Sequence, residues 1–232
     1  MRLLIDVGNT SLKAVLWENG QIQPCVINNI SWQQITVVIY ACVGRSELLK
    51  QLLAQAKTYN IDCFEATVSS ELSGLRCAYQ QVGNLGIDRW LALISGYTLY
   101  PNMAAIVVDA GTATTIDVLN NDGQHLGGWI LPGLDLMTSS LTQNTQRVFD
   151  DANTPFANEL GKNTPNGLKN GALVATIGAI EQAKLHLNTK NSLLIFAGGY
   201  GQLLQGHFSQ SIFDPMLVMK GLNYWYELAK KS

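Results

Sequence analysis

The feature of this sequence that most constrains its fold is a unit that occurs twice, half a chain apart. An apolar segment at residues 2–5 leads into the turn DVGNT, an alternating segment and a tight Asn19-Gly20 turn. The same order returns from Ala104 on, as AAIVV, DAGTATT, TIDVLN and the turn NDG. Asp6 and Asp109, which end the two apolar segments, are 109 − 6 = 103 residues apart. Two copies of one β-meander predict a duplicated α/β architecture with a boundary near residue 100.

Helical and buried-strand patterns alternate after each meander. In the first half they predict strands at 35–43 and 61–66, a helix at 46–59 with Ser46 as N-cap, and a helix from Asp88 to before Pro101. In the second half they predict a long helix from Thr164 or Asn166 through His186, a strand at 191–197 and a C-terminal helix beginning at Pro215. We therefore expect two similar halves, residues 1–102 and 103–232, each with a sheet flanked by helices.

The composition excludes several classes of protein. Hydrophobic residues make up 47% and charged residues only 14%, so the chain is not disordered. With 15 Lys+Arg against 17 Asp+Glu, it has no basic field for a nucleic-acid backbone. A weakly charged surface is easily desolvated, which favours self-association.

No segment is predicted to enter a membrane. Charged residues such as Arg45 interrupt the best apolar candidates well before the roughly 18 residues that a spanning helix needs. The N-terminal segment MRLLIDVGNT reaches Asp6 too soon for the apolar region of a secretion signal. We expect a cytoplasmic protein.

The two turns that follow the repeated strands share one design. Each has an Asp at a strand end and then a glycine turn, in which Gly8 or Gly111 lets the backbone approach a ligand and direct N–H groups at an anion. The carboxylates of Asp6 and Asp109 are suited to a cation that neutralises a phosphate. A plain turn explains one Asp-x-Gly, but two at equivalent points favour a pair of phosphate-binding turns that grip a triphosphate across a cleft.

The segment GIDRW, residues 86–90, places a carboxylate and a guanidinium together at the start of an apolar helix. In one interpretation Asp88 is only the helix N-cap and Arg89 a surface ion-pair partner. In the other, Arg89 captures a carboxylate or phosphate, and Asp88 orients an attacking hydroxyl and takes its proton.

Three further features are weaker alone. AGGYG at 197–201 lets a nucleoside lie against bare backbone or is an ordinary turn, and GGWILPG at 127–133 is explained by a strand end before a helix. Lys13 is either a phosphate contact or a solvated strand-edge lysine.

Together, DVGNTSLK, GIDR, DAGTATT and GGWILPG, in this order, resemble the signature blocks of the type III pantothenate kinases, members of the acetate and sugar kinase/actin superfamily. The resemblance extends from Asp6 to Gly198. It implies a duplicated ribonuclease-H-like (actin-like ATPase) fold, a homodimer, and transfer of the ATP γ-phosphate to pantothenate, giving 4′-phosphopantothenate in the first step of coenzyme A synthesis. It also implies Mg²⁺ and a monovalent cation, K⁺ or NH₄⁺.

The resemblance also assigns site residues. It implies that Asp88 is the proton acceptor and that Asp109 is the ligand of the monovalent cation. The ATP-binding residues would be Asp6, Val7, Gly8, Asn9, Thr10, Ser11, Leu12, Lys13 and Thr112. The pantothenate-binding residues would be Tyr79, Gly86, Ile87, Asp88, Arg89 and Thr164.

Two other functions remain open from the sequence. A phosphohydrolase of the same superfamily would share the Asp-Gly turns but lack the GxDR block, which this chain has at residues 86–89. A non-catalytic ATP-binding regulator, similar to a transcription accessory factor, would bind ATP without forming product.

Overall fold

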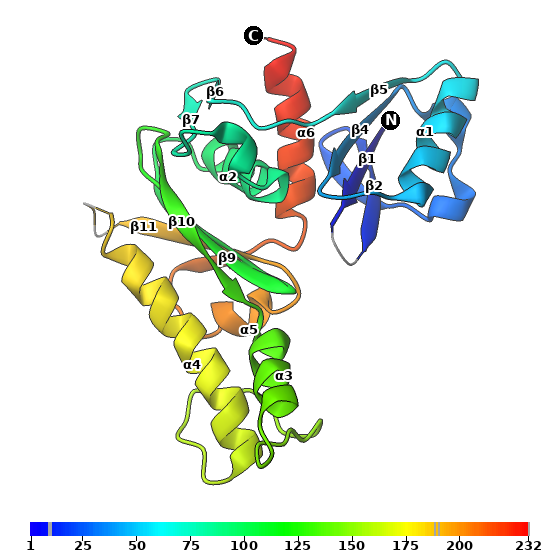
Figure 1. The fold of residues 1–232 in the computed structure, drawn as a ribbon. Coiled ribbons are helices and arrows are strands. Elements are labelled where there is room, and N and C mark those ends of the chain that lie inside the picture. Colours follow the sequence, from blue (N-terminus) through cyan, green and yellow to red (C-terminus); the bar gives the residue numbers. More distant parts are fainter. Residues whose placement is uncertain (9–10, 188, 190, 232) are drawn as a thin grey trace. The chain divides into compact units, whose positions relative to one another are not determined.

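The computed structural model describes residues 1–8, 11–187, 189 and 191–231. The chain divides into two compact units, the first made of residues 1–101 and 216–232 and the second of residues 102–215. Each unit has its own five-stranded sheet, and helices pack on it (Figure 1).

The first unit contains β1 (Arg2–Val7), β2 (Leu12–Glu18), β3 (Gln21–Pro24), β4 (Val37–Cys42), α1 (Glu47–Thr58), β5 (Asp62–Glu65), the short strands β6 (Glu71–Leu72) and β7 (Leu75–Arg76), α2 (Ile87–Leu99) and α6 (Leu217–Ala229). The second contains β8 (Ala104–Ala110), β9 (Ala113–Leu119), β10 (His125–Pro132), α3 (Leu134–Asn144), α4 (Thr164–Lys184), β11 (Ser192–Ala197), α5 (Gly201–Gln205) and β12 (Ser211–Phe213).

The two sheets have the same topology. Their strand orders are β3-β2-β1-β4-β5 and β10-β9-β8-β11-β12. In each sheet the first three strands pair antiparallel as a meander, the fourth pairs parallel with the central strand, and the fifth pairs parallel with the fourth. The predicted duplication with mixed sheets is therefore confirmed, strand by strand.

Local chemistry accounts for the predicted hairpin turns. Asn19 and Gly20 both have positive φ, 50° and 80°, as a two-residue hairpin turn with the twist of the flanking strands requires. In the second copy the Asn120 side chain accepts hydrogen bonds from the backbone N–H groups of Asp122 and Gln124, at 3.1 and 2.7 Å. Gly123, with φ 76°, completes that turn.

The C-terminal helix belongs to the first unit. The division expected from the sequence, between residues 102 and 103, assigns this helix to the second half. Helix α6 packs against α2, β1 and β4. A Cβ on Gly221 would collide with the backbone carbonyl of Leu91, so the two helices touch backbone to backbone. Ser95 also donates a hydrogen bond to the Leu217 carbonyl, at 2.5 Å. Because these contacts join segments more than 120 residues apart, no local sequence pattern predicts them.

Helix boundaries follow the expected caps closely. The side chain of Ser46 caps α1 by accepting from the Leu49 N–H, at 3.2 Å. Helix α4 begins at Thr164, one of the two predicted starts, but ends at Lys184, before His186. The C-terminal helix begins at Leu217, after Pro215. Among the described residues, no helix has the length and apolar character needed to cross a membrane.

Candidate functional site

The first phosphate-turn candidate follows β1. Asp6 is directly opposite Lys13 in the antiparallel β1–β2 pair, so the two side chains leave the same face of the sheet. Gly8 N–H donates to the Ser11 carbonyl across the turn, at 3.0 Å. Asp6 is half-buried, whereas Lys13 and Ser11 are exposed. A carboxylate and an ammonium therefore flank one glycine turn.

Four other residues were predicted for this turn. Val7 is a buried strand residue and Leu12 is half-buried, so they contribute mainly backbone to the turn. Asn9 and Thr10 lie outside the described residues.

The second turn candidate repeats this geometry after β8. Asp109 is directly opposite Thr115, as Asp6 is opposite Lys13. Gly111 N–H donates to the Ala113 carbonyl, at 2.9 Å, and Thr112 is exposed at the tip. In both turns the Asp is therefore paired with a residue of the next strand, as the predicted equivalence of the two turns requires.

The two weaker glycine motifs both pack on the second turn. From the end of GGWILPG, Gly133 N–H donates to the Thr112 carbonyl, at 2.9 Å. From AGGYG, Tyr200 N–H donates to the Ala110 carbonyl, at 3.0 Å. A Cβ on Gly198, which has φ 81°, would collide with the Asp109 carboxylate. The structure therefore gathers three glycine motifs, separate in sequence, around Asp109.

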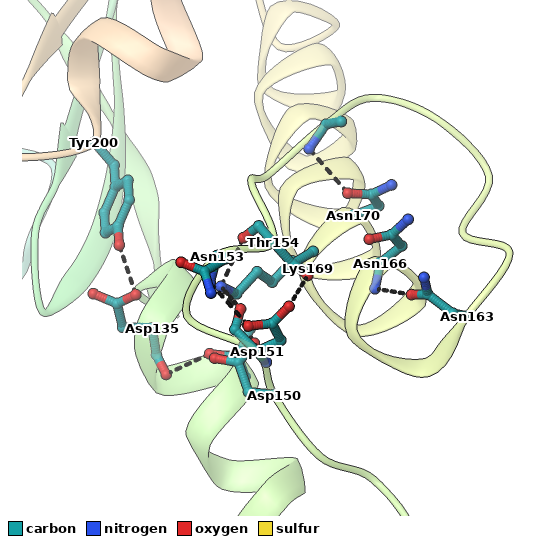
Figure 2. Close-up of polar contacts among 12 residues, drawn as sticks. Asp135, Asp150, Asp151, Asn153, Thr154, Asn163, Asn166, Lys169, Asn170 and Tyr200 are labelled. Carbon is teal, nitrogen blue, oxygen red and sulfur yellow. Dashed lines mark hydrogen bonds and ion pairs between the residues drawn. The ribbon is translucent and has the colours of Figure 1, made fainter.

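One contact in this cluster was not predicted. Tyr200 donates its hydroxyl to Asp135 Oδ1, at 2.6 Å, which connects AGGYG with the first turn of α3 (Figure 2). Burial, the hydrogen bond and the negative charge of Asp135 raise the pKa of the Tyr200 hydroxyl to about 12. This hydroxyl is therefore protonated at neutral pH and serves as a hydrogen-bond donor.

The GIDR segment begins α2, and it corrects the interpretation of Asp88 as the helix N-cap. The N-cap is Gly86, and Asp88 lies inside the first turn. There its Oδ1 accepts from the Arg89 N–H, at 2.8 Å, and lies 2.6 Å from where a Gly86 Cβ would be. Glycine at position 86 therefore makes room for this carboxylate rotamer, and the helix N-terminus favours its negative charge.

The surface interpretation of Arg89 is also wrong, because the residue is only 5% exposed. Arg89 Nη1 donates to the Tyr79 hydroxyl, at 3.0 Å, and the guanidinium carbon lies 5.7 Å from the centre of the Tyr79 ring. Tyr79 thus fixes the orientation of a buried guanidinium beside Asp88. Guanidinium groups held in a fixed orientation commonly bind carboxylates or phosphates.

Thr164 is the first residue of α4 and is exposed. Asn163 caps the helix by accepting from the Asn166 N–H, at 2.9 Å. Figure 1 shows that α4 begins beside the far end of α3 and runs toward β11. The structure therefore places Thr164 at the start of a capped helix, next to the loop that joins α3 to α4.

The two Asp turns fit a cation that arrives with a phosphate ligand. Among the described residues, no group of three or more His, Cys, Asp or Glu side chains could hold a metal ion alone. Mg²⁺ commonly binds through one or two carboxylates, waters and substrate phosphates, and each turn supplies one carboxylate beside a glycine turn. Gly198 has no Cβ that would collide with Asp109 Oδ1, so the carboxylate can keep its position beside the turn.

Comparison with known proteins decides among the possible families. The family model of the type III pantothenate kinases matches residues 26–185. The chain belongs to the type III pantothenate kinase family. A type III pantothenate kinase of Pseudoalteromonas translucida is 75% identical over 232 residues, covering 100% of this chain and 99% of that protein. One of Colwellia psychrerythraea is 33% identical and covers 97% of this chain and 95% of its own length.

Solved structures agree on the fold of this pantothenate kinase family member. A protein of Campylobacter jejuni, named as a Baf family transcriptional activator, is 25% identical with a TM-score of 0.65, covering 99% of this chain and 100% of its own. A protein of Sinorhizobium meliloti, named as a 2-dehydro-3-deoxygalactonokinase, has a TM-score of 0.57 at 12% identity, with 98% of each chain covered. The predicted actin-like ATPase fold and the assignment to ATP-dependent kinases are confirmed.

Proposed function

We propose that the chain transfers the γ-phosphate of ATP to the primary hydroxyl of pantothenate, giving 4′-phosphopantothenate and ADP, the first step of coenzyme A synthesis. The observation that carries this proposal is the hydrogen bond from the buried Arg89 to the half-buried Tyr79, next to Asp88 at the start of α2, in a chain that also has two equivalent Asp-Gly turns. A phosphohydrolase has no need of a site for an alcohol substrate.

In the proposed reaction Asp88 orients the pantothenate hydroxyl, whose oxygen forms a bond to the γ-phosphorus while the bond to the ADP oxygen breaks. The hydroxyl proton passes to the Asp88 carboxylate. Transition states of phosphoryl transfer are usually loose, so the base acts late. Arg89, oriented by Tyr79, binds the pantothenate, together with the backbone of Gly86 and Ile87 and with Thr164.

The ATP phosphates bind the backbone N–H groups and hydroxyls of the two turns, with Asp6, Lys13 and Thr112 among the contacts. Bound Mg²⁺ neutralises phosphate charge and aligns the phosphoryl group for in-line attack. Asp109 is the proposed ligand of K⁺ or NH₄⁺. In support, a Cβ on Gly8 or Gly111 would make only an ordinary van der Waals contact, with a backbone oxygen at 3.7 or 3.9 Å, so the described protein atoms do not themselves require glycine at these positions.

The direct test is purified protein with ATP, Mg²⁺, K⁺ and pantothenate, with the product identified by mass. Asp88→Asn should lower kcat by about 10²- to 10⁴-fold with an unchanged circular dichroism spectrum. Asp62→Asn, an exposed position in β5 of the same unit, is the matched control and should retain full activity. Near wild-type turnover by the Asp88→Asn variant would remove Asp88 from the mechanism.

The same assay tests the alternative of a non-catalytic regulator. That alternative deserves a test because a relative is named as a Baf family transcriptional activator. ATP binding without product formation would favour it. For the cation, wild-type activity should depend on added K⁺ or NH₄⁺, and Asp109→Asn should raise the concentration required. Indifference to both ions would refute the assignment to Asp109.

We also propose a homodimer in the cytoplasm. Support for the dimer comes from α3 and the loop at residues 145–163, which expose Leu136, Leu141, Phe149 and Leu160, the last at 93%. So many exposed apolar side chains are typical of an interface. Light scattering should give the mass of a dimer, and Leu160→Asp should shift it toward that of a monomer.

A further inference from the structure

The loop between α3 and α4 is long and irregular, yet it is held at defined points. It runs from residue 145 to residue 163 without helix or strand and ends at Thr164. Structureless loops of this length in compact domains are usually functional. Its attachment to α4 depends on two adjacent side chains, Lys169 and Asn170, which are only 7% and 6% exposed (Figure 2).

The Lys169 ammonium has one acceptor for each of its three protons. Its Nζ lies 2.8 Å from the Asp151 carbonyl, 2.8 Å from the Thr154 carbonyl and 3.3 Å from Asp150 Oδ1. The loop presents these acceptors in a turn of its own, in which Thr154 N–H donates to the Asp151 carbonyl, at 3.0 Å. Removal of the Lys169 ammonium from water costs free energy. The three acceptors offset this cost only when the turn adopts this conformation.

Asn170 fixes the next part of the loop. Its Oδ1 accepts from the Ala157 N–H, at 2.9 Å, and its Nδ2 donates to the Glu159 carbonyl, at 3.0 Å. Farther along, a Cβ on Gly161 would collide with Gly167, so the chain lies directly against the first turns of α4. The loop is thus attached at successive points up to the cap of α4.

The same loop reaches the glycine cluster around Asp109. Phe156 packs edge-on against the Tyr200 ring, with 5.5 Å between the ring centres. Lys169 Nζ lies 5.7 Å from the centre of the Phe156 ring. Lys169 therefore lies close to four residues of the loop, Asp150, Asp151, Thr154 and Phe156.

We propose that Lys169 is a positioning residue for pantothenate: it holds the loop on α4 and thereby fixes Thr164 for substrate binding. This rests on the proposed kinase function and on the assignment of Thr164. Lys169 itself is buried against the loop carbonyls and acts on the substrate only through Thr164. Loss of the ammonium should weaken pantothenate binding and leave ATP binding nearly unchanged, because the Asp109 turn keeps its contacts with Gly133 and Tyr200.

The experiment is steady-state kinetics of Lys169→Met. We expect the KM for pantothenate to rise about tenfold, with the KM for ATP within about twofold of wild type. Lys169→Arg should recover part of the loss, since it restores a cation. Lys184→Met is the matched control on the same helix, because Lys184 pairs with the neighbouring Glu181 at 2.7 Å near solvent, and it should leave both KM values unchanged.

A double-mutant cycle distinguishes positioning from general destabilisation. If Lys169 acts through Thr164, Lys169→Met should add little to the KM increase caused by Thr164→Ala. Independent, additive effects, an unchanged KM for pantothenate, or equal increases for both substrates would overturn the proposal. If Lys169→Met does not fold, Asp150→Asn is the second variant, because it lies at a more exposed position and removes the charge of one acceptor. It should raise the KM for pantothenate by a smaller factor and leave the KM for ATP nearly unchanged. Absence of 4′-phosphopantothenate with the wild-type protein would instead refute the kinase function itself.

Discussion

Substitution of Gly133 by Ala tests whether the glycine cluster around Asp109 holds the second phosphate turn in place. Gly133 has φ −65° and ψ 165°, angles that alanine adopts without strain, so any effect is steric. The new Cβ would lie 2.7 Å from the Thr112 carbonyl oxygen and 2.9 Å from its carbon, and closer still to the Gly111 oxygen. Because ordinary contacts begin at 3.4 Å, the turn or the start of α3 must move by roughly 1 Å.

The expected magnitude follows from this displacement. Overpacking costs about 1–3 kcal/mol, and loss of the 2.9 Å hydrogen bond from Gly133 N–H to Thr112 adds about 1 kcal/mol. The free energy of unfolding should therefore fall by about 2–4 kcal/mol. A turn displaced by nearly 1 Å should also lower kcat/KM for ATP by about 10²-fold.

Urea unfolding and ATP-dependent kinetics at saturating pantothenate measure the two effects. Gly178→Ala is the control, because it lies in the middle of α4 with no described atom within 4 Å of the new Cβ. This variant should be more stable by about 0.5–1 kcal/mol and fully active. If Gly133→Ala matched the wild type in both stability and kcat/KM for ATP, the argument from close packing would be wrong.

Three further substitutions test single contacts. The pKa of Tyr200 is raised from 10.0 to about 12, so its protonated hydroxyl stabilises the fold below pH 10 and loses this effect as the pH rises to about 12. Between these two pH values the free energy of unfolding of the wild type should fall more steeply than that of Tyr200→Phe. Urea unfolding at a series of pH values measures this difference. Tyr79→Phe removes one hydrogen-bond acceptor of Arg89 and should raise the KM for pantothenate about tenfold; an unchanged KM would mean that other contacts orient Arg89. Ser46→Ala removes the cap of α1 and should lower the free energy of unfolding by about 1 kcal/mol, measured in urea.

The duplicated architecture could be predicted because its determinants are local. Each meander requires only alternating strands and turn residues such as Asn19 and Gly20, which lie next to each other in the chain. The sheet order then follows from the repetition. The place of α6 could not be predicted, since it depends on close contact between Gly221 and Leu91, which are distant in sequence.

The site residues divide in the same way. The pattern GIDR indicates that Asp88 and Arg89 lie at a helix start, but it does not predict whether they are buried. Only the packed structure shows that Arg89 is 5% exposed. Lys169 had no signal in the sequence, because a lysine within a helix normally faces solvent. Its acceptors come from an irregular loop whose path no periodicity predicts.

The glycines themselves separate into two kinds, although the sequence presents them alike. Gly133 and Gly198 are required by the protein, because a Cβ at either position would collide with the second turn. Gly8 and Gly111 are not required in this way: neither is among the described residues with positive φ, and the nearest described protein atoms to a Cβ would be at 3.7 and 3.9 Å. The described protein atoms therefore require glycine at the two positions that shape the second turn and do not require it at the other two. Close approach of a phosphate ligand to the backbone would account for glycine at Gly8 and Gly111.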